Sequence, residues 1–317
     1  MGDRVLRGMA AVVLNWKGRA DAARCVRSLL APGGPERILL LDNGSGEGES
    51  GALAAEFAGQ GRVEVVALPR NLGFAGGVNE GVSRAREGGA TEILLANSDA
   101  VLEAGAAAAL RAALEGDAGA GAAGPLILED DGTRRAWFAG GRVAPSFGQV
   151  VHDHHGREEA SLPRAVRATG FLTFCVVLIR ARSWDAAGPL DAEFFAYGED
   201  ADWCLRARAA GLRLLHVPAA VARHRGSGST GRRSPLQAYL LARAAVLLAR
   251  KRRGVWTRGI VFWPWMLAVR APHEVLRSLL AGRPAAAAAG LRGLLDGARG
   301  GPPRAFRGRL GLDAGAA

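Results

Sequence analysis

The chain has 317 residues, of which 49% are hydrophobic and 22% charged, a composition that is typical of a globular protein and excludes a disordered one. This length fits one large α/β domain with an appendage, or two domains. The three cysteines, Cys25, Cys175 and Cys204, are odd in number and widely spaced, which favours buried, reduced thiols in a cytosolic protein and excludes a disulfide framework or a zinc cluster. No secretory signal and no run of about twenty uncharged apolar residues is apparent, so we expect no membrane-spanning helix.

The net charge of +11 is unevenly distributed along the chain. From Arg232 to the end there are sixteen Arg or Lys residues against three acids, a balance of +13, so the first 231 residues sum to −2. The basicity therefore belongs to the C-terminal part. We do not expect nucleic acid to be a partner of the remainder.

Four short apolar segments alternate with helical patterns in the first hundred residues. A continuous apolar run bounded by polar residues is typical of a buried parallel strand. The alternation predicts an α/β fold with a mostly parallel central sheet flanked by helices and joined by right-handed crossovers. The predicted strands cover residues 10–14, 38–41, 63–68 and 93–96, and the first predicted helix runs from about residue 20 to residue 30.

Polar side chains follow each of these four strands. In an open α/β sheet, ligands bind at the carboxyl ends of the strands. One polar cluster would mean little, because polar residues follow strands in any case. Four clusters that include an aromatic residue, two acids and an arginine favour a binding site. They are Asn15-Trp16, Asp42-Asn43, Arg70-Asn71 and Asn97-Ser98-Asp99.

A glycine-rich segment, residues 73–81, opens the helix after the third strand. Glycines allow a close backbone approach to a ligand, and a helix N-terminus suits a phosphate; a tight turn with close helix–sheet packing is the alternative. The segment is not G-x-G-x-x-G and does not follow the first strand, which disfavours a dinucleotide oxidoreductase. Asp99 supplies one carboxylate for Mg²⁺ or Mn²⁺, or else caps a helix that begins near Glu103.

The middle of the chain has weaker patterns. We predict a strand at 122–128, a polar hairpin-like region at 129–135, and a hydrophobic strand at 169–179. Residues 137–167 have no regular pattern and contain His152, Asp153, His154 and His155. Because this cluster lacks a cysteine or a second ligand pair at usable spacing, we interpret it as a flexible loop.

An acidic block lies within residues 194–206. A helical pattern runs from Ala201 to Ala210, so Glu199, Asp200 and Asp202 fall on its first turn, where backbone N–H groups and the helix dipole favour negative charge. The block is either an acidic helix cap or a catalytic carboxylate. The i,i+4 spacing of Asp202 and Arg206 predicts a structural ion pair.

The tail beyond residue 232 combines apolar and basic residues. It holds an apolar stretch at 236–248, the basic run 250–253, and a tryptophan-rich segment in which eleven residues separate Arg258 from Arg270. That length is about half of a bilayer span. We therefore expect a helix lying in the interface of an anionic membrane, with a buried homodimerisation helix as the alternative.

Taken together, the motifs resemble the inverting nucleotide-sugar glycosyltransferases of family 2, and most closely their rhamnosyltransferase-like and galactofuranosyltransferase-like bacterial branch. The resemblance covers about residues 9–230 and implies a GT-A fold. Six motifs carry it in the order of the family: 12–16, 41–45, 70–79, 95–99, the acidic block 199–202 with Arg206, and His224.

The resemblance implies roles for individual residues. Trp16 would stack on the pyrimidine and Asp42 would accept from its ring N–H, while Arg70 and the 73–79 turn would face the nucleotide and the diphosphate. Asp99 and His224 would bind Mg²⁺ or Mn²⁺, although Asn97 replaces the first acid of the D-x-D metal motif of the family. The complete predicted nucleotide-sugar set is Asn15, Trp16, Asp42, Asn43, Arg70, Asn71, Gly73, Phe74, Gly76, Asn79, Asn97 and Ser98.

The predicted reaction is an inverting transfer of rhamnose from dTDP-rhamnose, or of another sugar from a UDP donor, to a hydroxyl of a cell-surface glycan or lipid-linked acceptor. Asp200 would be the catalytic base, and Glu199 would orient acceptor hydroxyls or raise the proton affinity of Asp200. A non-catalytic nucleotide-sugar-binding protein is the alternative.

The predicted organisation is a GT-A domain at 1–231, with a nucleotide part at about 9–128 and an acceptor part at about 129–231, followed by a basic amphipathic helical tail at 232–317. The expected location is the cytoplasm, with peripheral contact at the inner face of the cell membrane through the tail.

Overall fold

The structure is a computed structural model that describes residues 8–46, 48–226, 234–251, 262–310 and 312. The N-terminal half alternates strands and helices. Its elements are β1 (Met9–Asn15), α1 (Arg19–Leu29), β2 (Arg37–Asp42), α2 (Glu49–Glu56), β3 (Val63–Ala67), α3 (Gly73–Glu87), β4 (Glu92–Asn97), β5 (Ala100–Leu102), α4 (Ala106–Glu115) and β6 (Ala120–Glu129).

The second half begins with short strands and 3₁₀ turns and ends in helices. Its elements are β7 (Ala136–Phe138), β8 (Gly141–Ala144), η1 (Pro145–Phe147), β9 (Gln149–His152), η2 (Glu159–Ser161), β10 (Arg167–Ala168), β11 (Val176–Arg180), α5 (Ala181–Ala187), η3 (Ala192–Phe194), α6 (Glu199–Ala209), β12 (Arg213–His224), α7 (Pro235–Lys251), α9 (Trp263–Trp265), η5 (Met266–Arg270), α10 (Ala271–Leu280), α11 (Pro284–Arg299) and η6 (Gly308–Leu310).

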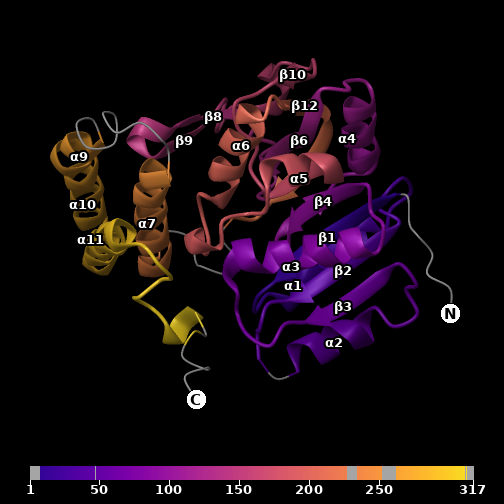
Figure 1. The fold of residues 1–317 in the computed structure, drawn as a ribbon, viewed down its shortest axis with the longest axis horizontal. Helices are drawn as coiled ribbons and strands as arrows, with labels where there is room; N and C mark the ends of the chain where they lie inside the picture. The colour runs from indigo at the N-terminus through magenta and orange to yellow at the C-terminus, as the bar shows by residue number, and fades with distance from the viewer. Residues whose placement is uncertain (1–7, 47, 227–233, 252–261, 311, 313–317) are drawn as a thin grey trace.

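One mixed sheet forms the centre of the molecule (Figure 1), with strand order β10-β12-β6-β11-β4-β1-β2-β3. The pairs β1–β2, β1–β4 and β2–β3 are parallel, whereas β11 is antiparallel to both β4 and β6. The carboxyl ends of β1, β2 and β4 therefore lie at one edge, as predicted.

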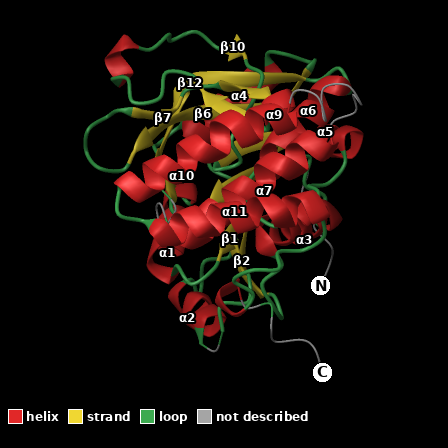
Figure 2. Ribbon diagram, turned by 90° about the vertical axis from the view of Figure 1, so that its left-hand side faces the viewer, coloured by secondary structure: helices red, strands yellow, loops and turns green. Residues whose placement is uncertain are grey.

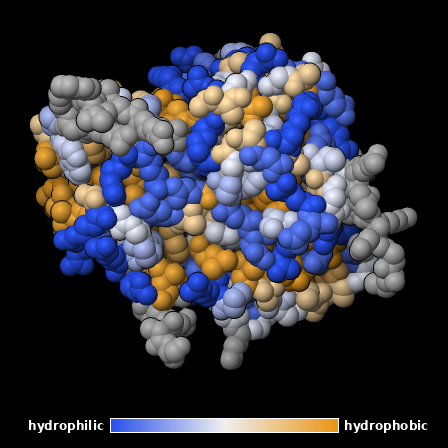
Figure 3. Space-filling view, viewed as in Figure 1, coloured by the Kyte–Doolittle hydropathy of each residue, from blue (hydrophilic) through white to orange (hydrophobic). Residues whose placement is uncertain are grey.

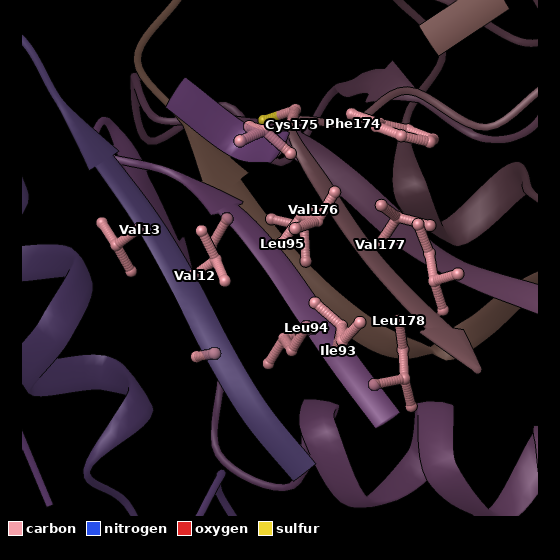
Figure 4. Packing of buried hydrophobic residues seen from close by; sticks show 14 of the residues in the cluster. Val12, Val13, Ile93, Leu94, Leu95, Phe174, Cys175, Val176, Val177 and Leu178 are labelled. Atoms are coloured by element: carbon pink, nitrogen blue, oxygen red, sulfur yellow. The ribbon is translucent and has the colours of Figure 1, made fainter. Parts of the chain in front are cut away.

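The core is formed by the central strands. Val12 of β1, Leu95 of β4 and Val177 of β11 are at most 1% exposed, and their side chains lie along neighbouring strands (Figure 4). Strands buried on both faces need continuous apolar runs, which explains why β1, β2 and β4 are recognisable in the sequence.

The predicted strands of the N-terminal half and the strand at 122–128 are confirmed with small changes of boundary. The prediction for 169–179 is too long, because only Val176–Arg180 forms a strand. Residues 137–167 are more regular than predicted, since they include the β8–β9 hairpin and β10. The long strand β12 was not predicted: Pro218 lies in a register shift between Val217 and Val221, which interrupts the strand pattern.

The C-terminal helices pack together beside the sheet. Helix α11 lies along α7, with Gly293 against the Tyr239 carbonyl, and α10 lies next to them (Figures 1 and 2). The predicted boundary at 231/232, the second half of the basic run 250–253 and the first part of the tryptophan-rich segment lie outside the described residues. Among the residues that are described, no helix is both long and apolar enough to cross a membrane.

Candidate functional site

The ends of β1 and β2 present a small buried network of polar side chains. Asn15 is fully buried and Asp42 is 3% exposed; the Asn15 amide Nδ2 lies 3.5 Å from Asp42 Oδ1 and 3.2 Å from Glu49 Oε1. Burial raises the pKa of Asp42, and hydrogen bonds from Ser45 and Asn15 partly oppose this shift. Glu49, at the start of α2, is a member of this network that sequence reasoning missed.

Asn43 and Asn71 fasten two loops to each other. Asn43 Nδ2 donates to Asn71 Oδ1 and to the Gly73 carbonyl at 3.0 Å each, and Asn71 Oδ1 also accepts from the Gly73 N–H at 2.8 Å. Both amides are buried. Their contacts hold the loops after β2 and β3 in place, whereas Arg70 between them is exposed.

The glycines of α3 make contacts with protein. Gly73 has φ +74°, and a Cβ there would lie 2.5 Å from the Phe195 carbonyl oxygen. A Cβ on Gly77 would lie 2.6 Å from a Leu14 methyl group. The Asn79 side chain donates to the Leu190 carbonyl at 2.8 Å and accepts from its N–H at 2.9 Å. These contacts fit the alternative reading of the glycines, a tight turn with close helix–sheet packing. Contacts to a nucleotide stay a prediction for Gly73, Phe74, Gly76 and Asn79.

Asp99 and His224 lie side by side at the edge where β5 pairs with β12. His224 Nε2 is 3.1 Å from Asp99 Oδ1, and the side chains are 6% and 11% exposed. Burial alone would lower the pKa of His224, but Cys175 and Asp99 outweigh it and raise this pKa well above its usual value. The helix-cap alternative for Asp99 is wrong, because β5 follows it and Gly105 caps α4.

Two residues that the sequence did not reveal adjoin this pair. Cys175 is buried against His224, and burial raises the pKa of its thiol. The Trp137 ring lies 4.5 Å from the His224 ring and 5.0 Å from the His152 ring, measured between centroids. His152 belongs to β9, and its Nδ1 is 3.2 Å from the Trp137 carbonyl oxygen. The histidine cluster is therefore partly ordered in a hairpin and not wholly a flexible loop.

The acidic block lies on the first turn of α6, as predicted. Asp200 Oδ1 accepts from the Ala201 N–H at 2.7 Å, and the Phe174 backbone also hydrogen-bonds to this carboxylate. Burial nevertheless dominates these contacts and raises the pKa of Asp200 to about 6. The turn thus stabilises the carboxylate only in part.

Glu199 is more deeply buried than its neighbour. Glu199 is 5% exposed. Its burial, and to a smaller extent the negative charge of Asp200, raise the pKa of Glu199 well above its usual value. Both carboxyls therefore hold a proton more tightly than ordinary acids do, and Asp200 is the member of the pair that ionises first. One acid can accept a proton while the other can donate a hydrogen bond.

The rest of the block holds the turn in place. The predicted ion pair is confirmed: Arg206 Nε lies 2.8 Å from Asp202 Oδ2. The preceding segment is conformationally unusual, because the non-glycine residues Phe195 and Tyr197 have φ of +66° and +67°. Fully buried Arg243 of α7 donates to the carbonyls of Phe194 at 2.9 Å and Glu193 at 2.7 Å, and also to that of Gly301. The C-terminal helices therefore hold the segment that precedes the acids.

Phe174 and Cys175 connect the acidic block to the Asp99–His224 pair. Phe174 contacts Asp200, and the adjacent Cys175 contacts His224 and is influenced by both Asp99 and Asp200. Trp16 packs against a cluster that includes Phe195, just ahead of the acids. Four predicted site residues also have a buried polar atom without a hydrogen-bond partner among the described residues: Trp16 Nε1, Asn97 Oδ1, Glu199 Oε2 and His224 Nδ1. Buried polar groups are nearly always paired, so these atoms are what a site for a polar ligand would present.

Comparison with known proteins agrees with this arrangement. The family described as "Glycosyltransferase like family 2" matches residues 7–253. The chain belongs to this family. It is therefore a glycosyltransferase, and the resemblance inferred from the six motifs is confirmed.

Among curated proteins, the chain is 29% identical over 271 residues to an N-acetylglucosaminyl-diphospho-decaprenol L-rhamnosyltransferase of Mycobacterium tuberculosis, covering 79% of this chain and 87% of the relative. Among solved structures, it is similar to GalNAc-T7 with UDP, GalNAc and Mn²⁺ (TM-score 0.57, 15% identity, 90% of this chain and 59% of that one). It also resembles a mannosyltransferase from Pyrobaculum calidifontis in complex with GDP-Man and Mn²⁺ (TM-score 0.53, 16% identity, 91% and 76%). These structures confirm the GT-A fold, although the chain spans only 59% of the length of the first.

Proposed function

We propose that this glycosyltransferase moves rhamnose, with inversion, from dTDP-rhamnose to a hydroxyl of a lipid-linked glycan acceptor. The observation that carries the proposal is the proximity of Asp200 to the Asp99–His224 pair. Phe174 hydrogen-bonds to Asp200, and the next residue, Cys175, contacts His224. This proximity supports a role for Asp200 as a proton acceptor close to groups suited to a diphosphate and its cation. The curated relative supports the choice of sugar and acceptor, since its name specifies a rhamnosyl transfer to a diphospho-decaprenol lipid.

Asp200 is the general base of the proposed reaction. Its pKa of about 6 leaves it ionised at neutral pH yet more basic than an ordinary aspartate, which suits proton abstraction near that pH. As the acceptor oxygen bonds to the anomeric carbon, the hydroxyl proton passes to Asp200. The bond from that carbon to the phosphate oxygen breaks, and the nucleoside diphosphate leaves. Attack from the face opposite the leaving group gives inversion.

The residues around Asp99 fit a divalent cation. The Asp99 carboxylate lies 3.1 Å from the His224 imidazole, which must release its proton to bind a metal, and Asn97 Oδ1 on the same motif is buried without a partner among the described residues. Within that part of the chain, no group of three or more His, Cys, Asp or Glu could hold a metal on its own. Two protein ligands suffice for a cation that takes its others from phosphate and water. When bound, Mg²⁺ or Mn²⁺ would neutralise charge on the departing diphosphate.

The nucleoside is proposed to bind at the ends of β1 and β2. Trp16 offers an aromatic face, and its Nε1 is buried without a partner among the described residues. Asp42 offers an acceptor for the N–H of a pyrimidine ring, and it is held by Asn15 and Ser45. Thymine and uracil share that N–H, so dTDP and UDP donors both satisfy Asp42.

A lipid-linked acceptor places the reaction at a membrane surface. Exposed leucines gather on the C-terminal helices, with Leu267 62% and Leu280 80% exposed, and apolar side chains gather over this side of the molecule (Figure 3). We therefore propose peripheral contact with the inner face of the cell membrane through these helices. The alternative is that the same surface forms the interface of a homodimer.

Thermal-shift screening tests the donor assignment. We expect dTDP with Mn²⁺ or Mg²⁺ to raise the melting temperature more than GDP does, and dTDP-rhamnose to release dTDP when acceptor is added. Binding of dTDP-rhamnose without any release of dTDP would instead support a non-catalytic nucleotide-sugar-binding protein, which the family assignment disfavours.

A further inference from the structure

A groove of about 320 Å³ lies between helices α7, α10 and α11. Small residues on α7 and α11, among them Ala238, Ala286 and Gly290, leave the space, and Leu241 and Leu291 border it. A Cβ added to Gly290 would meet no atom within 4 Å. The groove is therefore open to a chain-like apolar ligand.

The charged residues along the groove are mainly positive. Arg270, Arg277 and Arg283 line it together with Glu274, and Glu274 is paired with Arg277 at 2.7 Å. Arg270 Nη1 is buried without a hydrogen-bond partner among the described residues. An apolar groove with an excess of arginine complements a molecule that joins a hydrocarbon chain to phosphate.

The groove also reaches the segment that carries the catalytic acids. Gln237 lines the groove, and its Nε2 lies 3.4 Å from the Tyr197 hydroxyl oxygen. Tyr197 comes two residues before Glu199. A Cβ on Gly198 would lie 3.2 Å from Ala244 Cβ of α7. One face of α7 thus borders the groove while another contacts the acidic block.

We propose that this groove binds the hydrocarbon chain of the phosphate-bearing lipid acceptor, so that its sugar is presented to Asp200. The inference rests on the proposed function and deepens it, because it assigns the lipid part of the acceptor to a definite place. The leucine-rich surface around the groove faces the bilayer, from which the chain enters.

The test fills the groove without disturbing the site. In Gly290→Trp the new side chain projects into open space, and Gly51→Trp is the matched control, because Gly51 lies on α2 outside the groove and also meets nothing within 4 Å. Farnesyl phosphate binding is measured by calorimetry, with inorganic phosphate as the probe that lacks the chain. We expect Gly290→Trp to weaken farnesyl phosphate binding at least tenfold, Gly51→Trp to leave it unchanged, and inorganic phosphate to bind far more weakly to all three proteins.

Transfer assays separate this inference from the proposed function. The expected result is that Gly290→Trp loses at least tenfold in rate with a long-chain N-acetylglucosaminyl-diphospho-polyprenol and keeps its rate with a water-soluble, short-chain acceptor. Equal losses with both acceptors, or unchanged farnesyl phosphate binding, would overturn the groove assignment. No transfer by the wild type to either acceptor would instead refute the proposed function. A loss of dimer in sedimentation without a change in lipid binding would assign the groove to a second copy and also overturn the proposal.

Discussion

Glu199 and Asp200 are neighbours in sequence, yet their surroundings give them different affinities for a proton. Glu199 is buried and Asp200 is partly buried, but Asp200 accepts backbone hydrogen bonds from Ala201 and Phe174, whereas Glu199 Oε2 has no partner among the described residues. Hydrogen bonds to a carboxylate favour its ionised form. Asp200 therefore loses its proton first, and its charge then raises the pKa of Glu199 further.

Asp200→Asn removes the proposed base while keeping its shape. We expect kcat to fall about 10²–10⁴-fold, the usual contribution of a general base, with donor binding in a thermal-shift assay unchanged. The wild type should also lose activity below an apparent pKa of about 6, because the proton then occupies the base. An activity profile that is flat between pH 5 and pH 8 would contradict this assignment.

Glu199→Gln tests the other acid. Because the acidic limb near pH 6 is assigned to Asp200, the variant should retain it. Stability gives a second measurement. An acid whose pKa is raised by folding ionises first in the unfolded chain, so the wild type loses stability as the pH rises above the ordinary glutamate value of about 4.3. Gln cannot ionise, so the melting temperature of the variant relative to wild type should rise from pH 4 to pH 8. A constant difference would argue against the raised pKa of Glu199.

Helix α7 of the C-terminal part is joined by hydrogen bonds and ion pairs to residues 191–200, the catalytic segment that ends in the two acids. Arg243 joins α7 to the carbonyls of Glu193 and Phe194 and to the loop after α11. Lys251 at the end of the same helix pairs with Asp191 and with Glu193. These contacts hold the chain through the positive φ angles of Phe195 and Tyr197, which are costly for non-glycine residues.

Arg243→Lys keeps the charge but cannot reproduce the fan of hydrogen bonds to three carbonyls. We expect a loss of kcat of about tenfold or more with little change in dTDP binding, because the acids shift while the nucleotide residues stay. Arg250→Lys is the control, since Arg250 donates to the Gly297 carbonyl of α11 at 2.7 Å and, among the described residues, makes no hydrogen bond to the catalytic segment. Equal effects of the two substitutions would indicate general destabilisation instead.

The sequence predicts individual site residues and local pairs better than it predicts which distant residues meet in the site. Asn15, Asp42 and Asp99 follow strands with clear apolar patterns, and the spacing of Asp202 and Arg206 is that of a helical ion pair. Trp137 and Cys175 were missed because sheet pairing brings them to His224 from distant parts of the chain. Gly73 looks like a phosphate-loop glycine in sequence, yet in the structure it makes room for Phe195. Long-range packing of this kind leaves no periodic signal.

For the whole molecule, the division of charge predicts its orientation at a membrane. The first 231 residues sum to −2 and the remainder to +13, so the C-terminal side should face anionic lipid. Sedimentation with vesicles should show binding that requires anionic lipid and weakens as salt is raised.

Leu280→Asp should reduce vesicle binding several-fold, because it places a charge on an exposed apolar surface. Val166→Asp is the control: Val166 is 50% exposed but lies next to β10, away from the C-terminal helices. Binding that is insensitive to Leu280→Asp, or lost equally with Val166→Asp, would contradict docking through these helices.

We propose that Asp200 takes the acceptor proton during transfer from a nucleotide-sugar donor. The most direct measurement compares wild type and Asp200→Asn with dTDP-rhamnose, a divalent cation and an N-acetylglucosaminyl-diphospho-lipid, following the release of dTDP and the rhamnosylated product together. With Asp200 as the base, we expect equal amounts of dTDP and product from the wild type, and a loss of about 10²-fold or more in the variant. Near wild-type transfer by Asp200→Asn would contradict it.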